Sequence, residues 1–202
     1  MILAIDTSTA ACTAALFDEG GECVAARDEL IGRGHAERLA PMLDELLEGR
    51  RAAAIIVGIG PGSFTGIRVG IAAAQGLAIG WGAALSGMSS LALIAAAAGQ
   101  DQEVVAAMNG GHGELFIQAF DRALKPTSAL LNLPPARAAS LFHAEAIAGP
   151  GATALVGARG WGKAIEAWPS ASLALRLPQA LRGLPPDPLY ARAPDAKAKS
   201  AA

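Results

Sequence analysis

Hydrophobic positions in the first half of the chain follow two spacings, one typical of strands and one typical of helices. Apolar runs predict strands at residues 2–5, 13–17, 22–30, 53–57 and 83–86, with a glycine turn at 18–21. Helical spacing predicts a helix through Leu39, Leu43, Leu46 and Leu47, and two more at residues 64–80 and 89–98. Pro41 lies within the first of these helices and either starts its regular part or kinks it. The predicted order is therefore β-β-β-α-β-α-β-α.

The second half of the chain has a weaker pattern. Residues 103–108 and 114–120 predict two strands joined by a glycine-rich turn at 109–113, whereas beyond residue 134 the sequence becomes alanine-rich helix, loops and prolines. We therefore predict two domains, residues 1–99 and a reduced second copy at residues 100–202. Leu189 and Tyr190 are apolar anchors near the end, and they predict that the tail packs back on the first domain.

Composition agrees with a compact globular protein. Of the 202 residues 52% are hydrophobic, and the formal net charge is only −2, which gives no basis for independent binding of nucleic acid. The apolar stretch 71–85 is shorter than the ~20 residues that span a membrane. The first residues lack the basic region of a secretory leader, so we expect a cytoplasmic protein that does not enter a membrane. Cys12 and Cys23 are too few for a disulfide framework, and we expect both to be small buried residues.

The most distinctive segment is the glycine-rich run from Gly58 to Arg68, which follows a predicted strand and opens a predicted helix. Such a turn gathers backbone N–H groups at the positive end of a helix dipole and suits an anion. It is not a Walker P-loop, because Ile67 and Arg68 stand where that motif needs Lys and then Ser or Thr. It is not a dinucleotide fingerprint either, because Ser63 occupies the third glycine position. A tight turn with close helix–strand packing is the alternative that spacing alone favours.

Two other loops suit an anion. The candidates are Asp6, Thr7, Ser8 and Thr9 after the first predicted strand, and Asn109, Gly110 and Gly111 after the first strand of the second half. A run such as 6–9 usually forms an Asx or Ser/Thr turn that satisfies its own backbone. The glycines of the second loop can turn backbone amides toward an anion, as a nest does. Asn-Gly is also a favoured hairpin turn, and we rank that interpretation first for the second loop.

Five segments together resemble one bacterial family. They are residues 1–17, 35–47, 58–78, 85–95 and 188–197, with the sequences MILAIDTSTAACTAALF, HAERLAPMLDELL, GIGPGSFTGIRVGIAAAQGLA, LSGMSSLALIA and PLYARAPDAK. In this order they resemble the TsaB (YeaZ) family, densely over the first half and the tail and loosely between them. The resemblance implies an α/β fold of the actin-like, Hsp70-like (ribonuclease H-like) ATPase class, with two domains of which the second is reduced.

The resemblance also implies a function. TsaB-like proteins are non-catalytic subunits that scaffold and activate a TsaD-like transferase. With a TsaE-like ATPase, that transferase makes N6-threonylcarbamoyladenosine at position 37 of tRNA (t6A37). On this basis we expect those two proteins as partners, contact with tRNA only through the complex, and no cofactor.

Metal chemistry is disfavoured by the same comparison. The paralogue TsaD resembles residues 85–95 but carries two metal-binding histidines there, and the resemblance places Ser90 and Ile94 at their positions. Ile has no donor atom and Ser is a poor neutral ligand. We therefore expect no metal and no catalytic residue in this chain.

The resemblance extends to the candidate loops and to the tail. Residues 6–9 resemble the first phosphate loop of the actin-type superfamily, and residues 109–113 resemble a phosphate loop of TsaD rather than the usual TsaB turn. We interpret both as degenerate phosphate loops. Tyr190, Arg192 and Pro194 match the family's C-terminal Tyr-x-Arg-x-Pro pattern.

A partner surface is predicted on the first two helices. Small residues would let another helix approach closely, and the resemblance implies pairing with the first domain of the paralogue. The predicted interface residues are His35, Leu39, Leu43, Leu46, Gly66, Gly70, Ala73 and Ala74. The alternative is that both helices use these residues to cover their own sheet, with His35 as a capping or surface residue.

Two questions stay open at the level of sequence. An actin-type nucleotide-binding ATPase or carbamoyltransferase acting alone, through Asp6 and the 109–113 loop, is the alternative function, although the missing metal histidines disfavour it. The isolated protein is equally compatible with a monomer and with a homodimer.

Overall fold

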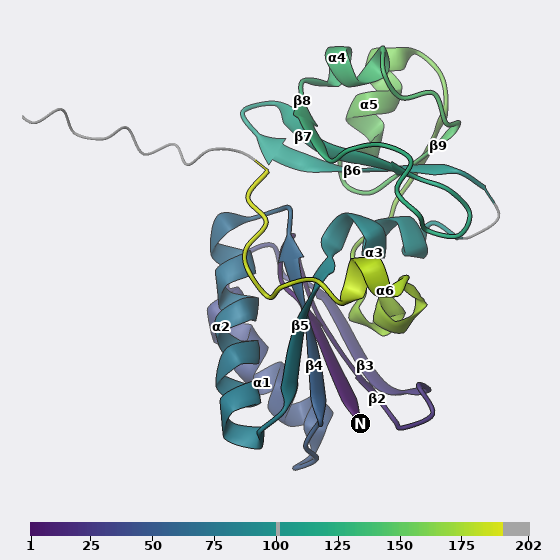
Figure 1. Cartoon of the computed structure of the whole chain (residues 1–202). Helices are drawn as coiled ribbons and strands as arrows, with labels where there is room; N and C mark the ends of the chain where they lie inside the picture. The colour runs from purple at the N-terminus through teal and green to yellow at the C-terminus, as the bar shows by residue number, and fades with distance from the viewer. Residues whose placement is uncertain (100–101, 192–202) are drawn as a thin grey trace, which may run out of the picture.

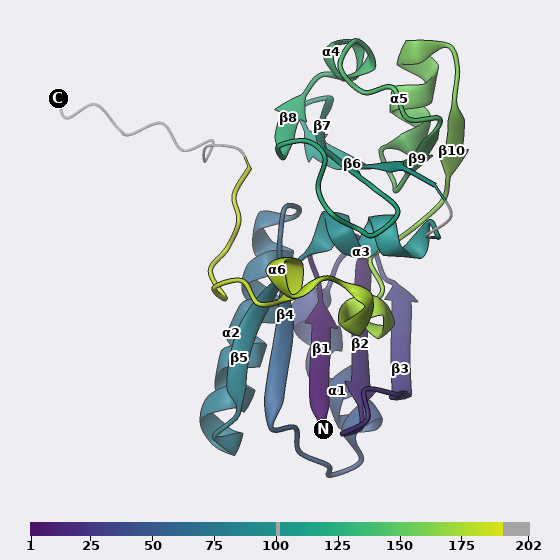
Figure 2. The ribbon, with the colours of Figure 1, turned by 45° about the vertical axis from the view of Figure 1, so that its right-hand side comes forward.

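The computed structural model describes residues 1–99 and 102–191, which form two five-stranded sheets, one above the other in Figures 1 and 2. The first sheet has the order β3-β2-β1-β4-β5. It combines the predicted antiparallel meander β1–β3 with two strands, β4 and β5, that run parallel to β1. Its strands are β1 (Ile2–Asp6), β2 (Ala11–Phe17), β3 (Cys23–Leu30), β4 (Ala54–Gly60) and β5 (Ala84–Ser89).

The central strands of the first sheet are buried on both faces. Leu3 and Ile5 of β1 belong to the core on one face, and Ala4 between them belongs to the core on the other. Every residue of β2 is buried as well. Strands covered on both faces have apolar runs rather than strict alternation, which is the pattern that predicted them.

Two helices cover the Leu3 face of this sheet. They are α1 (His35–Leu47) and α2 (Phe64–Trp81), and α2 begins where Ser63 Oγ accepts a hydrogen bond of 3.2 Å from the Gly66 N–H. Pro41 lies inside α1 and does not start it. The buried core residues that the two helices supply are Leu39, Met42, Leu43, Leu46, Leu47, Ile67, Ile71 and Ala74.

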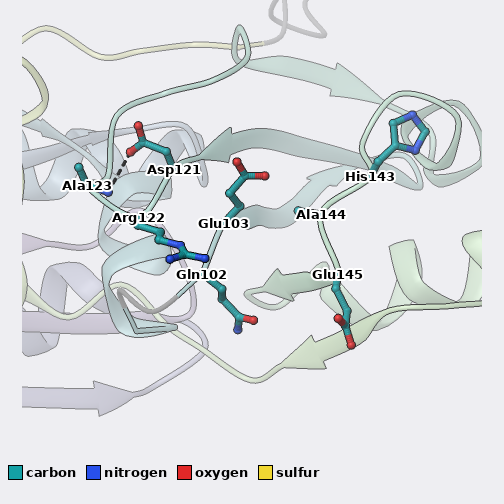
Figure 3. A pocket seen from close by; sticks show the side chains of 8 residues that line it. All are labelled: Gln102, Glu103, Asp121, Arg122, Ala123, His143, Ala144 and Glu145. Atoms are coloured by element: carbon teal, nitrogen blue, oxygen red, sulfur yellow. Dashed lines mark hydrogen bonds between the residues drawn. The ribbon is translucent and has the colours of Figure 1, made fainter.

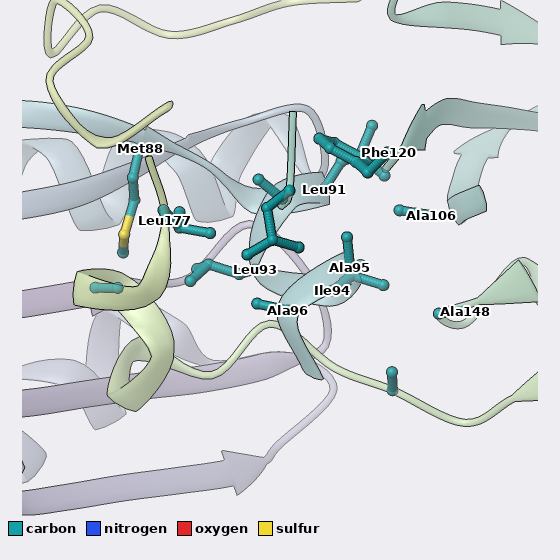
Figure 4. Packing of buried hydrophobic residues seen from close by; sticks show 14 of the residues in the cluster. Met88, Leu91, Leu93, Ile94, Ala95, Ala96, Ala106, Phe120, Ala148 and Leu177 are labelled. Carbon is teal, nitrogen blue, oxygen red and sulfur yellow. The ribbon is translucent and has the colours of Figure 1, made fainter. Parts of the chain in front are cut away.

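The third helix, α3 (Ser90–Ala97), lies between the two sheets (Figure 4). All residues from Ser90 to Ala96 are buried, as expected for a helix that is apolar on every side. Met88 and Leu177 lie on one side of it, and Phe120 lies toward the second sheet. The two sheets therefore share one hydrophobic core that is built around α3.

The second sheet has the order β10-β9-β6-β7-β8. Its centre is the predicted antiparallel hairpin of β6 (Val104–Gly111) and β7 (Glu114–Phe120), and α4 (Pro135–Ala139) and α5 (Ala152–Arg159) cover its far face. The sequence missed three strands, because three residues are too few to show a period and only pairing with longer strands makes them part of a sheet. These are β8 (Leu131–Leu133), β9 (Ala146–Ala148) and β10 (Lys163–Ile165).

After the second sheet the chain returns to the first. The 3-10 helix η1 (Ala171–Arg176) and α6 (Gln179–Arg182) lie on the α3 side of the first sheet (Figure 2). Residues 183–191, which we call the strap, then cross β5, where Leu184 and Gly87 exchange backbone hydrogen bonds of 2.7 and 3.0 Å. Arg192 and Pro194 of the C-terminal pattern lie outside the described residues. The domain boundary between residues 99 and 100 stays a prediction.

Two local predictions are corrected by the structure. Cys12 is buried as expected, but Cys23 is exposed because β3 is an edge strand. The hairpin tip is not Asn109-Gly110, since β6 continues to Gly111 with a bulge between Asn109 and Gly111. The turn is formed by His112 and Gly113, whose φ angles of 51° and 77° suit a type I′ turn.

Candidate functional site

Asp6 ends β1 and is completely buried. Its Oδ1 accepts hydrogen bonds from the Ser8 N–H (2.9 Å) and Ser8 Oγ (2.7 Å), and its Oδ2 accepts one from Ser90 Oγ (2.6 Å). Burial raises the pKa of the Asp6 carboxyl above its ordinary value, and the hydrogen bonds from Ser90 and Ser8 partly oppose that rise. The carboxyl group therefore ties the end of β1 to the start of α3.

The rest of the 6–9 loop is also satisfied by its neighbours. Thr7 Oγ1 donates to the Gly66 carbonyl over 2.7 Å, and Thr9 Oγ1 accepts from the Ala11 N–H over 3.1 Å. The Asp6–Ser8 and Thr9–Ala11 contacts are the local Asx and Ser/Thr turns that such sequences commonly form, whereas Thr7 joins the loop to α2. The loop thus uses its hydroxyl and carboxyl groups within the fold.

The glycine-rich turn between β4 and α2 is closed against this loop. A side chain at Gly58 would overlap the Asp6 carboxyl, and one at Gly62 would overlap the Ser8 carbonyl. The Ser63 N–H, which faces the loop, donates to the Ser8 carbonyl over 2.7 Å. The glycines therefore allow close approach of backbone to backbone, as the tight-turn alternative predicts.

A groove of about 1080 Å³ opens beside these loops, and it is lined by loops and helices next to the first sheet and by residues of β6 and β7 in the second sheet. It places Ser8 and Thr9 of one candidate phosphate loop on the same cavity as Asn109 of the other, although the two loops are far apart in the sequence. Trp168 also lines it, and its Nε1 is buried with no hydrogen-bond partner in the described part of the chain. Sequence reasoning missed Trp168, because a single aromatic residue in a loop has no pattern that marks it. The members of the candidate loops on this groove are Ser8, Thr9, Asn109, Gly110 and Gly111.

His35, at the start of α1, also lines the groove. It is largely buried, and its Nε2 lies 3.3 Å from the carbonyl oxygen of Ala11. This contact joins α1 to β2. The position is explained by packing within the chain, so His35 carries no separate argument for a partner contact.

A second hollow, of about 650 Å³, lies beside the second sheet (Figure 3). Glu103, Asp121, His143 and Glu145 line it, but Figure 3 shows these side chains pointing in different directions. Asp121 Oδ1 accepts the Ala123 N–H over 2.9 Å and so belongs to its own turn. Within residues 1–99 and 102–191, no group of three or more His, Cys, Asp and Glu side chains is arranged to hold a metal ion.

The two positions where the TsaD resemblance expects metal-binding histidines hold structural side chains. Ser90 donates its hydroxyl to Asp6, and Ile94 is fully buried in the core between the sheets. Both positions are thus occupied by groups that stabilise α3.

The residues predicted for a partner interface are mostly covered by this chain itself. A side chain at Gly70 would come within 2.5 Å of Thr7 Oγ1, and one at Gly66 would overlap the Thr7 carbonyl. Ala73 is half-buried. The buried members of the predicted interface pack within this chain, because helices that cover a sheet must turn one face toward it, and their contact with a partner stays a prediction. These members are Leu39, Leu43, Leu46, Gly66, Gly70 and Ala74.

The opposite side of α2 carries another row of small residues. Ala72, Gly76 and Gly80 recur every fourth residue on the exposed side, and nothing lies within 4 Å of a Cβ at either glycine. Ile79 lies on the same side and is 85% exposed. With Arg68, which is also exposed, these residues form what we call the α2 outer face. Within the described part of the chain, nothing covers the backbone of this face at Gly76 and Gly80 or encloses the Ile79 side chain.

A solved structure is similar to this chain over nearly its whole length. YeaZ from Pseudomonas aeruginosa matches with a TM-score of 0.79 and 31% identity, covering 94% of this chain and 98% of that one. The chain belongs to the TsaB (YeaZ) family. Its two-sheet α/β fold is accordingly of the actin-like, ribonuclease H-like class that the sequence predicted. The family model described as TsaD, tRNA N6-adenosine threonylcarbamoyltransferase, matches residues 27–130.

Two relatives carry the name tRNA threonylcarbamoyladenosine biosynthesis protein TsaB. The protein of Escherichia coli K12 is 40% identical over 129 residues, which are 60% of this chain and 55% of that protein. The protein of Haemophilus influenzae is 41% identical over 129 residues, which are 60% of this chain and 54% of that protein. The matches therefore span about half the length of these relatives. Among the helices of the described residues, none has the length and hydropathy that a membrane span requires.

Proposed function

We propose that this protein is a non-catalytic subunit of the cytoplasmic machinery that makes N6-threonylcarbamoyladenosine at position 37 of tRNA. It scaffolds and activates a TsaD-like transferase, with a TsaE-like ATPase as a further partner. The proposal is carried by Ser90 and Ile94 in a chain that matches the TsaD family model. The Ser90 hydroxyl is bound to Asp6, and Ile94 is a buried side chain with no donor atom. The chain keeps the fold of a transferase, while two core residues stand where the metal ligands are expected.

The outer face of α2 is the surface that we assign to the transferase. Ala72, Gly76 and Gly80 leave the helix backbone bare, so that a partner helix can approach it closely and gain dispersion contacts along its length. Ile79 supplies one large apolar side chain that needs cover. This surface replaces the buried residues that the sequence suggested, and it keeps the same helix as the site of docking.

Contact with tRNA comes through the complex. The formal net charge of −2 gives this chain no general attraction for a polyanion. The catalytic partner therefore supplies both the metal chemistry and the main tRNA surface, and this chain acts by holding that partner in its active arrangement.

Co-purification with the organism's TsaD-like protein tests the proposal. The wild-type chain and a Gly76→Ala variant are expected to form the complex and to support tRNA modification. A Gly76→Leu variant, whose new side chain projects into open space in the isolated protein, should stay folded and lose the complex. Failure of the wild-type chain to bind the transferase, or normal binding by Gly76→Leu, contradicts the assignment of partner or surface.

The same face also suits a second copy of the chain when no transferase is present. Sedimentation of the isolated protein distinguishes the two states. A homodimer on this face is expected to be broken by Gly76→Leu and to be displaced by the transferase.

The groove supports one other candidate function, an actin-type ATPase that acts alone. Both candidate phosphate loops line it, which favours a nucleotide. The internal hydrogen bonds of Asp6 and Thr7 disfavour it, since they use the groups that would face phosphate. Titration calorimetry of the isolated protein with ATP and Mg²⁺ decides between this ATPase and the non-catalytic subunit. We expect no heat of binding.

A further inference from the structure

The end of the strap is held by one contact with β4 and by two contacts with the start of α2. The Leu189 N–H donates to the Ile59 carbonyl over 2.8 Å. Arg68 Nε donates to the hydroxyl of Tyr190 over 2.9 Å, and the rings of Tyr190 and Phe64 lie 4.9 Å apart. Figures 1 and 2 show the strap crossing the first sheet and rising beside the upper end of α2 toward the second sheet.

The strap also forms part of the groove wall. Leu189, Tyr190 and Ala191 line the cavity together with Phe64. Tyr190 is 40% exposed and Leu189 is 38% exposed, so a large part of each residue is open to solvent. The strap, in the position that these contacts hold, therefore forms the groove wall on this side.

Arg68 is the residue that joins the strap to the α2 outer face. Its guanidinium lies on the Phe64 ring, with Cζ 3.6 Å from the ring centroid, and its Nε is used by Tyr190. Among the described residues, neither Nη group of Arg68 has a hydrogen-bond or ion-pair partner. The side chain is exposed one turn before Ala72, on the face that we assign to the partner.

We propose that Arg68 couples partner docking to closure of the strap. A carboxylate on the docking helix binds the two free Nη groups, while Nε continues to hold Tyr190. This inference rests on the proposed function. It adds that the partner carries an acidic side chain opposite Arg68, and that docking of the partner holds the strap closed along the groove.

The geometry of arginine makes this coupling positive. The guanidinium is planar with five N–H donors, so a carboxylate that takes two of them at the Nη end leaves Nε free for Tyr190. A hydrogen bond from Arg68 to Tyr190 costs conformational entropy, because the arginine side chain must be held in one position. A carboxylate that already holds the guanidinium from the other side reduces this cost. By linkage, a closed strap favours the partner to the same degree that the partner favours the closed strap.

The strap carries its own probes. Tyr190 is the one tyrosine among the 202 residues, so 3-fluorotyrosine gives a single ¹⁹F resonance from the strap. The Leu189 amide, which donates to Ile59, reports strap opening through its rate of hydrogen exchange. We expect the purified TsaD-like transferase to narrow the ¹⁹F signal to one state and to slow Leu189 exchange by ~fivefold or more, the lower end of typical allosteric coupling.

Two variants separate coupling from simple binding. Tyr190→Phe keeps the ring on Phe64 but removes the hydroxyl, and Arg68→Lys replaces the planar fork with a single ammonium. Each should still bind the transferase, Tyr190→Phe with nearly normal affinity, yet lose the partner-dependent slowing at Leu189. Arg51→Lys, at an exposed arginine before β4, is the matched control and should retain it.

The outcomes separate this inference from the proposed function. Absence of any complex with the wild-type chain overturns the proposed function. A complex that forms normally but leaves Leu189 exchange unchanged overturns the coupling alone. So does full slowing in Tyr190→Phe, which remains a test even where Arg68→Lys fails to fold.

Discussion

Ser90, the first residue of α3, donates a hydrogen bond of 2.6 Å to the carboxyl group of Asp6 at the end of β1. The two residues are both buried and lie 84 positions apart in the chain. Their contact attaches the helix between the sheets to the central strand of the first sheet. In this chain Asp6 is therefore a structural residue, and this assignment has consequences that can be measured.

Removal of the carboxyl group should destabilise the fold. In Asp6→Ala the Ser8 N–H and the hydroxyls of Ser8 and Ser90 lose their common acceptor in a buried place. The expected loss is about 1–3 kcal/mol for each donor that finds no other acceptor. Urea unfolding measures it, with Asp44→Ala on the exposed side of α1 as the control, expected within about 0.5 kcal/mol of the wild type. Equal stability of Asp6→Ala and wild type would disprove the structural role.

The raised pKa of Asp6 predicts a pH dependence with a definite sign. The folded protein holds the proton more tightly than the unfolded chain, whose carboxyl has an ordinary pKa of 3.8. Ionisation of Asp6 therefore removes stability as pH rises above that value, until the folded carboxyl is also ionised. Relative to Asp6→Asn, which does not titrate, the wild type should lose stability from about pH 4 upward. Urea unfolding over a pH series should show this slope, and the reverse slope would contradict the assigned burial effect.

Substitution of a glycine should affect stability differently on the two faces of α2. Gly70→Leu places a side chain against Thr7 and should destabilise the isolated protein by about 1–3 kcal/mol through overpacking. Gly76→Leu meets open space and should keep or raise the melting temperature, because leucine favours helix by up to about 1 kcal/mol over glycine. Thermal unfolding of the two variants side by side is the measurement. Similar melting temperatures would mean that the two faces are not distinguished as described.

The side chains at positions 90 and 94 predict the metal content. With a serine hydroxyl committed to Asp6 and an isoleucine in the core, the purified chain should hold no stoichiometric zinc, iron or magnesium. It should also transfer nothing to tRNA unless a TsaD-like protein is added. Elemental analysis after dialysis against chelator provides the check, and one tightly held ion per chain would overturn this expectation.

The two cysteines should differ in reactivity. Burial raises the pKa of the Cys12 thiol to about 11, and Cys12 is fully enclosed, whereas Cys23 lies on the exposed edge strand. A disulfide reagent should therefore label one thiol per native chain and the second only after unfolding. In Cys23→Ser the fast reaction should disappear. Two thiols that react at the same rate in the native protein would contradict the burial of Cys12.

Local sequence patterns were sufficient for the long elements of this protein. The strands at β1–β5 and the helices α1–α3 were predicted within a few residues, because long apolar runs and helical spacing reflect burial that each segment needs by itself. The same is true of the hairpin β6–β7. The strands β8 to β10 were missed, since three residues become a strand only through pairing with β6, β7 or each other.

The sequence by itself determined the long elements, the family and the absence of metal-ligand side chains at positions 90 and 94. It could not decide which side of α2 faces the sheet, because Gly66 and Gly70 on one side and Gly76 and Gly80 on the other are equally small. Only the tertiary structure decided this, through the close approach of Thr7 to Gly66 and Gly70. It likewise decided the role of Asp6, whose partner Ser90 is distant in the chain. Spacing along a helix records how small or apolar a face is, whereas the neighbour that covers the face comes from a distant segment.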